Sequence, residues 1–378
     1  MSSAWMLSNS QALINEPALD RIAQGRPARA DHFNDYIRPS EHLDVGIAAP
    51  DEFCSVNLVV SIATSGRPDL LHRTLTSLGE CKLPPGYSET IVVENGIRAG
   101  AEEVVKASRP ELKVRYIHSQ WANKSAAMNA ALKTVDDCLM FFTDDDVRFD
   151  PRILCHYSMI AGALGKRYYY GGPINVDYDA PPPRWLRQYL PYSAQGWKLN
   201  ESEGCIGSTK FLGSNWAAFS ENLRAAGGFN IDRGPGSHSG STGDETEMQE
   251  RLLSRGLKGV YLPKAYIWHY VPSNRCSPDW AIQRIHCHGI EEGARAVREC
   301  SKPRMMPPWR ISIRYLKGIL RAGMWTLSMR PELRFKAKHR RSYDRGLMKG
   351  VRLQYKAAKM PVINISGLVK SLKPLLPA

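Results

Sequence analysis

The sequence predicts an α/β fold in which short buried strands alternate with helices around a mainly parallel sheet. The first observation is a mostly apolar run over 56–63, which is followed by leucines at helical spacing over 70–78. The second is the recurrence of this pattern in the stretches "ETIVVENG", "KVRYIHS" and "CLMFFTDDD", each with a helical segment before or after it. The third is size, because 378 residues with 43% hydrophobic side chains can bury a large core. Together they predict βαβ units.

The chain divides into three predicted regions by composition. Residues 1–54 are polar and show little periodicity, so we expect an N-terminal extension. Residues 55–300 carry the strand and helix pattern of the α/β domain. Residues 301–378 hold 19 basic and 2 acidic side chains, whereas the first 301 residues hold 32 basic and 35 acidic ones. The net charge of +14 therefore belongs to a basic helical C-terminal tail.

The expected compartment is the cytoplasm. No stretch approaches the roughly 18 uninterrupted apolar residues of a membrane-spanning helix, and the N-terminus lacks a basic segment followed by an apolar one. The eight cysteines are scattered without a CxxC pair, which is typical of reduced thiols rather than of a disulfide framework.

Polar side chains follow four of the predicted strands at the point where each strand ends. Because ligands bind beyond the carboxyl ends of the strands in parallel sheets, we expect these side chains to line one site. Polar loops after single strands are common, but four at one edge are not. The side chains are Thr64 and Arg67, Glu94, Lys124, and the aspartates Asp144, Asp145 and Asp146.

The triple aspartate predicts a cation site. In an extended stretch, Asp144 and Asp146 point to one side and Asp145 to the other. Alternate carboxylates suit a hard ion, Mn²⁺ or Mg²⁺, which commonly bridges to substrate phosphates. A solvated acidic turn is the alternative interpretation.

A second acidic cluster opens a predicted helix in "GSTGDETEMQERLLSRG". Acidic residues are favoured at helix N-termini for structural reasons alone. Asp244 and Glu245 also follow a loop rich in Gly and Ser, as expected of a segment that closes over a ligand, and either carboxylate suits a general base. His269 follows an apolar run and is either a structural histidine or a further metal ligand, with Arg275 and Arg284 close behind.

With these motifs in order, the chain resembles a family 2 glycosyltransferase with the GT-A fold, an α/β/α sandwich that binds nucleotides. The resemblance covers residues 55–295 approximately. It rests on "VSIATSGRPDLLHRTLTSL", "IVVENG", "NKSAAMNAAL", "FFTDDD" as the Asp-x-Asp motif, "FLGSNWAAFSENLRAAGGFN" and "GDETEM".

The resemblance implies roles for these positions. Thr64, Arg67, Glu94 and Lys124 line the nucleotide pocket; Asp144 lies near the ribose or the metal; Asp146 binds the metal; and Asp145 is grouped with the donor-binding residues. The base falls at the second acid of a Glu-Asp motif. This chain reads Asp-Glu instead, so the base stays open between Asp244 and Glu245, with Glu245 favoured by position.

Two further positions depart from the family pattern. Glu94 replaces the usual Asp. Met128 stands where an Arg often precedes the residue matching Asn129, so Lys124, Arg275 or Arg284 are the candidates to compensate for the missing cation.

The resemblance implies a metal-dependent, inverting transfer of a sugar from a nucleoside-diphosphate sugar, with UDP the commonest nucleotide of the family, to a saccharide or lipid-linked acceptor. The expected setting is polysaccharide or glycolipid biosynthesis. The alternatives are a nucleotidyltransferase and an inactive sugar-nucleotide-binding adaptor.

The basic tail carries one further expectation. Over residues 309–327, apolar and basic side chains form two stripes of a predicted helix, which favours binding to an anionic membrane surface at the inner face of the cell membrane. Packing on the α/β domain is the alternative. No nucleic-acid recognition module is present in the tail.

Overall fold

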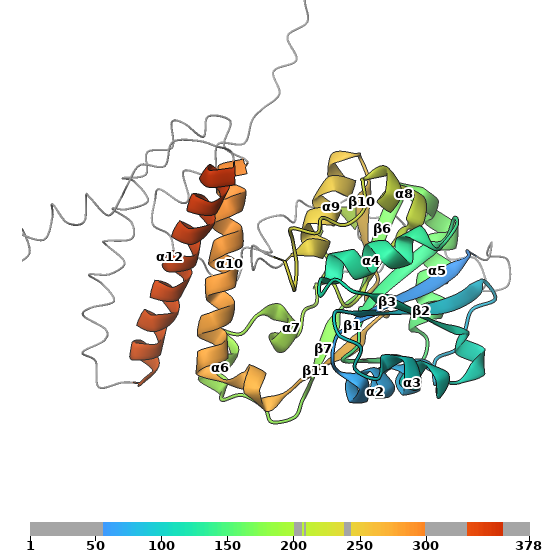
Figure 1. Ribbon diagram of the computed structural model, residues 1–378, viewed down its shortest axis with the longest axis horizontal. Helices are drawn as coiled ribbons and strands as arrows, with labels where there is room; N and C mark the ends of the chain where they lie inside the picture. Colours follow the sequence, from blue (N-terminus) through green and yellow to red (C-terminus); the bar gives the residue numbers. More distant parts are fainter. Residues whose placement is uncertain (1–55, 200–205, 208, 238–242, 299–330, 358–378) are drawn as a thin grey trace, which may run out of the picture.

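The computed structural model describes residues 56–199, 206–207, 209–237, 243–298 and 331–357 (Figure 1). The strands are β1 (Leu58–Thr64), β2 (Tyr87–Asn95), β3 (Val114–Ser119), β4 (Leu139–Asp144), β5 (Val147–Phe149), β6 (Tyr168–Gly171), β7 (Ile174–Tyr178), β8 (Ile206–Gly207), β9 (Trp216–Phe219), β10 (Lys258–Tyr261) and β11 (Ile267–Val271). The α-helices are α2 (Pro68–Leu78), α3 (Ala101–Lys106), α4 (Lys124–Lys133), α5 (Ile153–Leu164), α6 (Arg184–Arg187), α7 (Tyr192–Gln195), α8 (Ser220–Ala225), α9 (Asp244–Ser254), α10 (Pro278–Arg298) and α12 (Pro331–Ala357). Short 3₁₀ helices are η2 (Pro110–Leu112), η3 (Gly165–Arg167) and η4 (Ser273–Cys276).

The main sheet has eight strands in the order β3-β2-β1-β4-β9-β6-β10-β8. The strands from β3 to β4 are parallel, as are β6 and β10, whereas β9 runs antiparallel to both of its neighbours. A second sheet contains β5, β11 and β7. The predicted α/β fold with a mainly parallel sheet is therefore confirmed.

Alternate strand residues enter two separate cores, one on each face of the main sheet. Val60 and Ile62 of β1 pack with α2, α3 and α5, while Val59 of the same strand packs with α4, α8 and α9. Figure 1 shows α2 and α3 on one side of these strands and α4 on the other. The three layers are the α/β/α sandwich that the resemblance implied.

Strand β4 lies in the middle of the sheet, between β1 and β9. Its Phe141 and Phe142 are 0% and 1% exposed and belong to opposite cores. Full burial of such a side chain contributes about 1.5–3 kcal/mol, so this strand is anchored from both faces. The well-anchored strand therefore fixes the position of the aspartates that follow Thr143.

The C-terminal part of the described chain is a pair of long helices, α10 and α12, which lie side by side in Figure 1. They run in the same direction and approach closely at glycines. A Cβ at Gly346 would lie 2.0 Å from the carbonyl oxygen of His286, and one at Gly293 would lie 2.1 Å from that of Leu347. The hydroxyl of Ser342 donates a hydrogen bond to the Ile282 carbonyl at 3.0 Å. The absence of side chains at the glycines thus allows backbone contact between the helices.

Helix α12 also contacts the segment that includes α6. Trp185 and Tyr189 pack edge-to-face on Phe335, with ring centroids 5.2 and 5.0 Å away. Helix α12 lies inside the predicted basic tail, whereas the helix expected over 309–327 lies outside the described residues, as does the extension over 1–54. Within the described ranges, none of the helices combines the length and the apolar character needed to cross a membrane.

The glycine contacts predict a stability effect. In an exposed helix, Gly to Ala normally stabilises by about 0.5–1 kcal/mol. At Gly350, a Cβ would lie 1.9 Å from the Ile290 carbonyl oxygen. We therefore expect Gly350→Ala to lower the free energy of unfolding by about 1–3 kcal/mol through overpacking. Thermal unfolding of the full-length protein measures this, with Lys349→Ala on the exposed side as the control. Equal midpoints for the two variants would contradict the close helix contact.

Candidate active site at the carboxyl edge of the sheet

The predicted site residues at the ends of β1, β2 and β4 are neighbours in the sheet. Thr64 is in register with Glu94, and Ala63 is in register with Asp144. The chain thus places at one edge three groups that are about 30 or more positions apart in sequence.

The triple aspartate is a turn rather than an extended stretch. Strand β4 ends at Asp144, β5 begins at Val147, and the two residues between them form the turn. Asp144 is partly exposed, whereas Asp145 and Asp146 are buried. The predicted sorting nevertheless holds for the first and third aspartates, which lie together while the second points into the fold.

Asp145 is fully buried and is held by the β1–α2 connection. The Thr64 hydroxyl donates a hydrogen bond to Asp145 Oδ2 at 2.5 Å, and Arg67 Nε donates to the same oxygen at 3.2 Å. Arg67 Nη2 contacts the other carboxylate oxygen. Burial raises the pKa of Asp145 to about 6, an effect that Arg67 opposes. These contacts position Arg67 and Thr64 relative to the aspartate turn.

Asp146 is surrounded by three cationic or polar side chains. Its Oδ2 lies 2.8 Å from Arg67 Nη1 and 3.4 Å from Arg275 Nη1, and its Oδ1 lies 3.4 Å from His269 Nε2. Burial would raise its pKa, but His269, Arg67 and Arg275 outweigh burial and hold the pKa well below the usual range of a carboxyl group. Asp146 is therefore an anion at neutral pH.

Asp144, Asp146 and His269 form a group that fits a divalent cation. One ligand atom from each lies within 4.8 Å of the others. Asp146 Oδ1 is buried and, apart from its 3.4 Å contact with His269 Nε2, has no hydrogen-bond partner among the described residues. Two carboxylates and an imidazole are a donor set that Mn²⁺ accepts. The three residues predicted as metal ligands are thus brought together.

Lys124 connects this group to the second acidic cluster. Its ammonium contacts Asp144, and it lies within electrostatic range of Asp244 and Glu245. Burial would lower the pKa of Lys124, but these carboxylates outweigh it and raise the pKa. The side chain of Asn123 caps the helix by accepting from the Ala126 amide at 2.9 Å, which fixes where α4 begins.

The acidic pair lies at the start of α9, as predicted. Asp244 is 2% exposed, and its Oδ2 has no hydrogen-bond partner within the described ranges, whereas Glu245 is partly exposed. Burial of the Glu245 carboxyl group and the neighbouring charge of Asp244 raise its pKa well above the usual range, and Lys124 opposes this. Glu245 is thus the more accessible of the two candidates, and its pKa is raised.

The described half of the loop before α9 is bonded to the N-terminus of α4. Asn123 donates to the Ile231 carbonyl at 2.8 Å, and Ser125 donates to the Arg233 carbonyl at 3.0 Å. The Lys124 amide donates to the Pro235 carbonyl at 3.1 Å. The predicted closure of this loop stays a prediction, because residues 238–242 lie outside the described residues.

Glu94 is 1% exposed and holds the turn after β2. Its Oε1 accepts from the Ala99 amide at 2.7 Å, and its Oε2 accepts from the Tyr116 hydroxyl at 2.6 Å. This Glu therefore supports the loop beside the site. Its predicted contact with a nucleobase stays a prediction.

The three cations named as candidates to compensate for Met128 lie near the acidic groups. Met128 is 3% exposed and packs in the α4 core. Lys124 and Arg275 contact the aspartates directly. Arg284 of α10 is close enough to Glu245 for their charges to interact, although burial, the largest effect, lowers the pKa of its guanidinium. All three candidates to compensate thus lie around the site.

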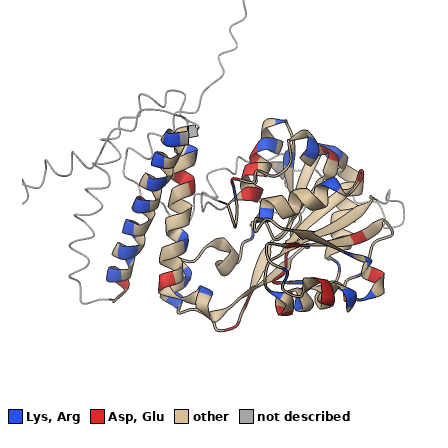
Figure 2. Ribbon diagram, in the orientation of Figure 1, with Lys and Arg blue, Asp and Glu red and all other residues tan. Residues whose placement is uncertain are grey.

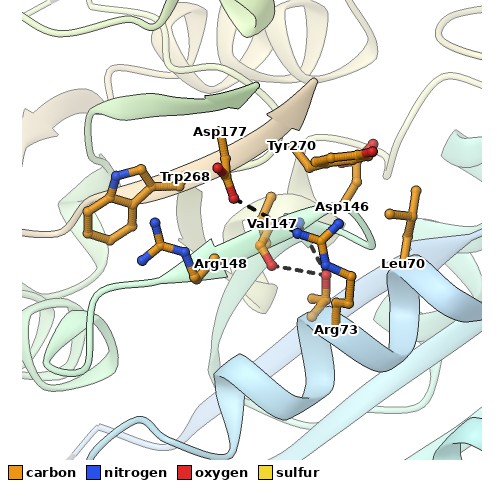
Figure 3. Close-up of a pocket in the computed structure, with 9 residues that line it drawn as sticks. Leu70, Arg73, Asp146, Val147, Arg148, Asp177, Trp268 and Tyr270 are labelled. Atoms are coloured by element: carbon orange, nitrogen blue, oxygen red, sulfur yellow. Dashed lines mark hydrogen bonds and ion pairs between the residues drawn. The ribbon is translucent and has the colours of Figure 1, made fainter. Parts of the chain in front are cut away.

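Asp146 also borders a small pocket between α2, β5, β7 and β11 (Figure 3). Its charged side chains already have partners. Arg73 lies 3.9 Å from the Asp177 carboxylate and 4.6 Å from the centre of the Tyr270 ring. Arg148 stacks over Trp268 at 4.1 Å. These contacts join the second sheet to α2.

Sequence reasoning missed two glycines that crowd the acidic pair. A Cβ at Gly213 would lie 3.1 Å from the Glu245 carboxyl carbon, and one at Gly234 would lie 2.7 Å from Asp244. Gly213 stands in the quoted stretch "FLGSN", but nothing in the sequence indicates that this glycine meets α9. A larger residue at either position would displace a carboxylate.

Comparisons with known proteins agree with this arrangement. The family described as Glycosyl transferase family 2 matches residues 59–219. No curated protein sequence matches the chain significantly.

Solved structures similar to the chain include the mannosyltransferase PcManGT from Pyrobaculum calidifontis in complex with GDP-Man and Mn²⁺, with 17% identity, a TM-score of 0.54, and coverage of 88% of this chain and 94% of that one. GalNAc-T7 with UDP, GalNAc and Mn²⁺ has 10% identity, a TM-score of 0.46 and coverage of 80% and 64%. TarS from S. aureus has 12% identity, a TM-score of 0.45 and coverage of 82% and 94%. The first of these similarities supports the fold.

Proposed function

Because the chain is a family 2 glycosyltransferase with the GT-A fold, we propose that it transfers a sugar from a nucleoside-diphosphate sugar to an acceptor hydroxyl with inversion of configuration. The observation that carries the proposal is the placement of two acidic groups close to the ammonium of Lys124. One is the cation-binding group of Asp144, Asp146 and His269, and the other is the pair that opens α9.

Asp144, Asp146 and His269 would hold the cofactor, Mn²⁺ or Mg²⁺. Bound there, the ion would offset the negative charge of the donor diphosphate and of the departing nucleotide. The mannosyltransferase of similar fold was solved with GDP-Man and Mn²⁺, which supports this choice of cofactor and donor class. Arg67 and Arg275, which touch Asp146, are placed to bind phosphate oxygens. Thr64, Glu94 and Lys124 would border the nucleotide.

Glu245 would act as the general base. The partly exposed carboxylate can reach an acceptor hydroxyl, whereas Asp244 is buried behind it. Its raised pKa makes it a stronger base than an ordinary glutamate. Deprotonation of the hydroxyl as its oxygen attacks the anomeric carbon from the side opposite the nucleotide gives a single displacement and inverts the configuration. The UDP-sugar donor favoured from the sequence is one member of this donor class.

The acceptor we propose is a saccharide or a lipid-linked molecule, in polysaccharide or glycolipid biosynthesis at the inner face of the cell membrane. From Lys302 onward the chain has 19 basic and only 2 acidic residues, and this positive charge supports peripheral association with an anionic surface.

A panel of nucleotide sugars tests the proposed function. The full-length protein with Mn²⁺ should release a nucleoside diphosphate from one or a few donors, and NMR of the product in the presence of an acceptor should show the opposite anomeric configuration. Release of pyrophosphate from a nucleoside triphosphate and a sugar phosphate would instead identify a nucleotidyltransferase. No turnover of any donor, with donor binding retained, would favour the inactive adaptor.

The raised pKa of Glu245 predicts a pH dependence. The base must be deprotonated to accept a proton, and burial and Asp244 favour the protonated form. The rate should therefore rise with pH through a pKa well above that of an ordinary glutamate and level off above it. The logarithm of kcat plotted against pH measures this. A rising limb centred near the ordinary glutamate pKa would contradict the assignment.

A further inference from the structure

The outer face of α12 carries a line of basic side chains. Figure 2 shows Lys and Arg along the length of this helix. At 100° per residue, six of the seven exposed ones fall within an arc of about 60° and extend over about 33 Å of helix, while Lys336 lies on another side. The basic stripe consists of Arg334, Lys338, Arg345, Lys349, Arg352 and Lys356.

No acidic side chain of α12 lies on the basic stripe. The two acidic residues of this helix are Glu332 and Asp344. Asp344 is buried and lies 3.3 Å from Arg340 Nε, and Glu332 is about 160° around the helix from Arg334. The stripe is therefore a continuous surface of one sign. A helix face that is merely solvated, the alternative interpretation, normally mixes both signs of charge.

The basic stripe is held in a fixed position relative to the active site. Glycine contacts lock α12 against α10, where Gly289 and Gly350 leave no room for a Cβ. Helix α10 follows η4, which carries Arg275 to Asp146, and α10 itself carries Arg284. The packed helices α10 and α12 thus connect the basic stripe to η4 and to the proposed diphosphate-binding residues.

We propose that the basic stripe of α12 docks the enzyme on an anionic lipid surface. A straight, rigid line of cations matches a planar array of lipid phosphates, and each basic residue near such a surface contributes about a fivefold increase in binding. Leu353, 41% exposed, stands beside the stripe and offers an apolar contact with the headgroup region. The inference assigns a surface to the membrane association proposed above, on which it rests for its biological setting.

Vesicle binding by the full-length protein tests this surface. The protein should sediment with vesicles that contain phosphatidylglycerol and not with vesicles of phosphatidylcholine alone. The variant Arg345→Gln/Lys349→Gln/Arg352→Gln should bind the anionic vesicles about 100-fold more weakly. The matched control, Lys82→Gln/Lys133→Gln/Arg152→Gln, removes the same charge from exposed residues of the α/β domain and should bind as the wild type does.

The outcomes separate docking from catalysis. The α12 variant should keep its thermal stabilisation by a nucleotide sugar with Mn²⁺, so a failure of the proposed reaction leaves this test intact. Equal losses in both triple variants would overturn the proposal in favour of a non-specific charge effect. Unchanged binding by the α12 variant would also overturn it, as would an RNA oligonucleotide that binds the stripe more tightly than the vesicles do.

Discussion

Replacing Glu245 by Gln should lower kcat by about 10²- to 10⁴-fold, the usual contribution of a positioned general base. Gln matches Glu in size but does not accept a proton. Gly213 has no side chain, and a Cβ there would lie 3.1 Å from the Glu245 carboxyl carbon. The glycine therefore leaves room for the Gln amide as it does for the carboxylate. Donor binding should change little, because the residues proposed to bind the donor are untouched. Steady-state kinetics and donor titration measure the two effects separately.

Substitutions at two neighbouring residues provide a control and a test of the alternative base. Glu247→Gln, one turn into α9 and paired with Arg251 at 2.8 Å, is the matched control and should retain activity. Asp244→Asn tests the alternative base. Its Oδ2 has no partner among the described residues, so the substitution acts through the pKa of Glu245, which should fall. Loss of activity in Asp244→Asn with normal activity in Glu245→Gln would reverse the assignment.

Replacing Asp146 by Asn should abolish metal-dependent turnover, with a loss of about 10³-fold or more, because a Lewis-acid ion is worth several kcal/mol in such a reaction. Asn lacks the charge that balances Arg67, Arg275 and His269 around this position. The raised positive charge then repels a divalent cation. Activity as a function of Mn²⁺ concentration measures the loss.

The control for this variant is Asp136→Asn, which removes one exposed carboxylate outside the site. It should keep the metal dependence of the wild type. Circular dichroism of Asp146→Asn should show a folded protein, because the turn is also held by backbone bonds such as that from the Tyr270 amide to the Asp146 carbonyl at 2.8 Å. Full activity of Asp146→Asn at the wild-type Mn²⁺ concentration would contradict the ligand assignment.

The sequence predicted the strands and the main site residues because local patterns encode them. Residues 58–62 of the first apolar run are buried on both sheet faces, and the groups after β1, β2 and β4 must meet wherever parallel strands are neighbours. The place of His269 after an apolar run left a structural histidine and a further metal ligand open, and the structure groups it with Asp144 and Asp146.

Other contacts could not be predicted because they join segments distant in sequence. The extended geometry assumed for the three aspartates was wrong, since a turn begins after Asp144 to start β5. The partners of Asp145 come from the β1–α2 connection, about 80 positions earlier. The glycines that join α10 and α12 resemble ordinary helix-weakening residues until both backbones are in place.

Thermal unfolding with a nucleotide sugar, in the presence and absence of Mn²⁺, tests the central claim most directly. At a ligand concentration about 100-fold above Kd, binding stabilises the folded state by about 2.7 kcal/mol, which raises Tm by several degrees. The wild-type Tm should rise only when the sugar nucleotide and Mn²⁺ are both present, and Asp146→Asn should show no rise. An equal rise without Mn²⁺, or an undiminished rise in Asp146→Asn, would contradict a metal-dependent donor site at Asp144, Asp146 and His269.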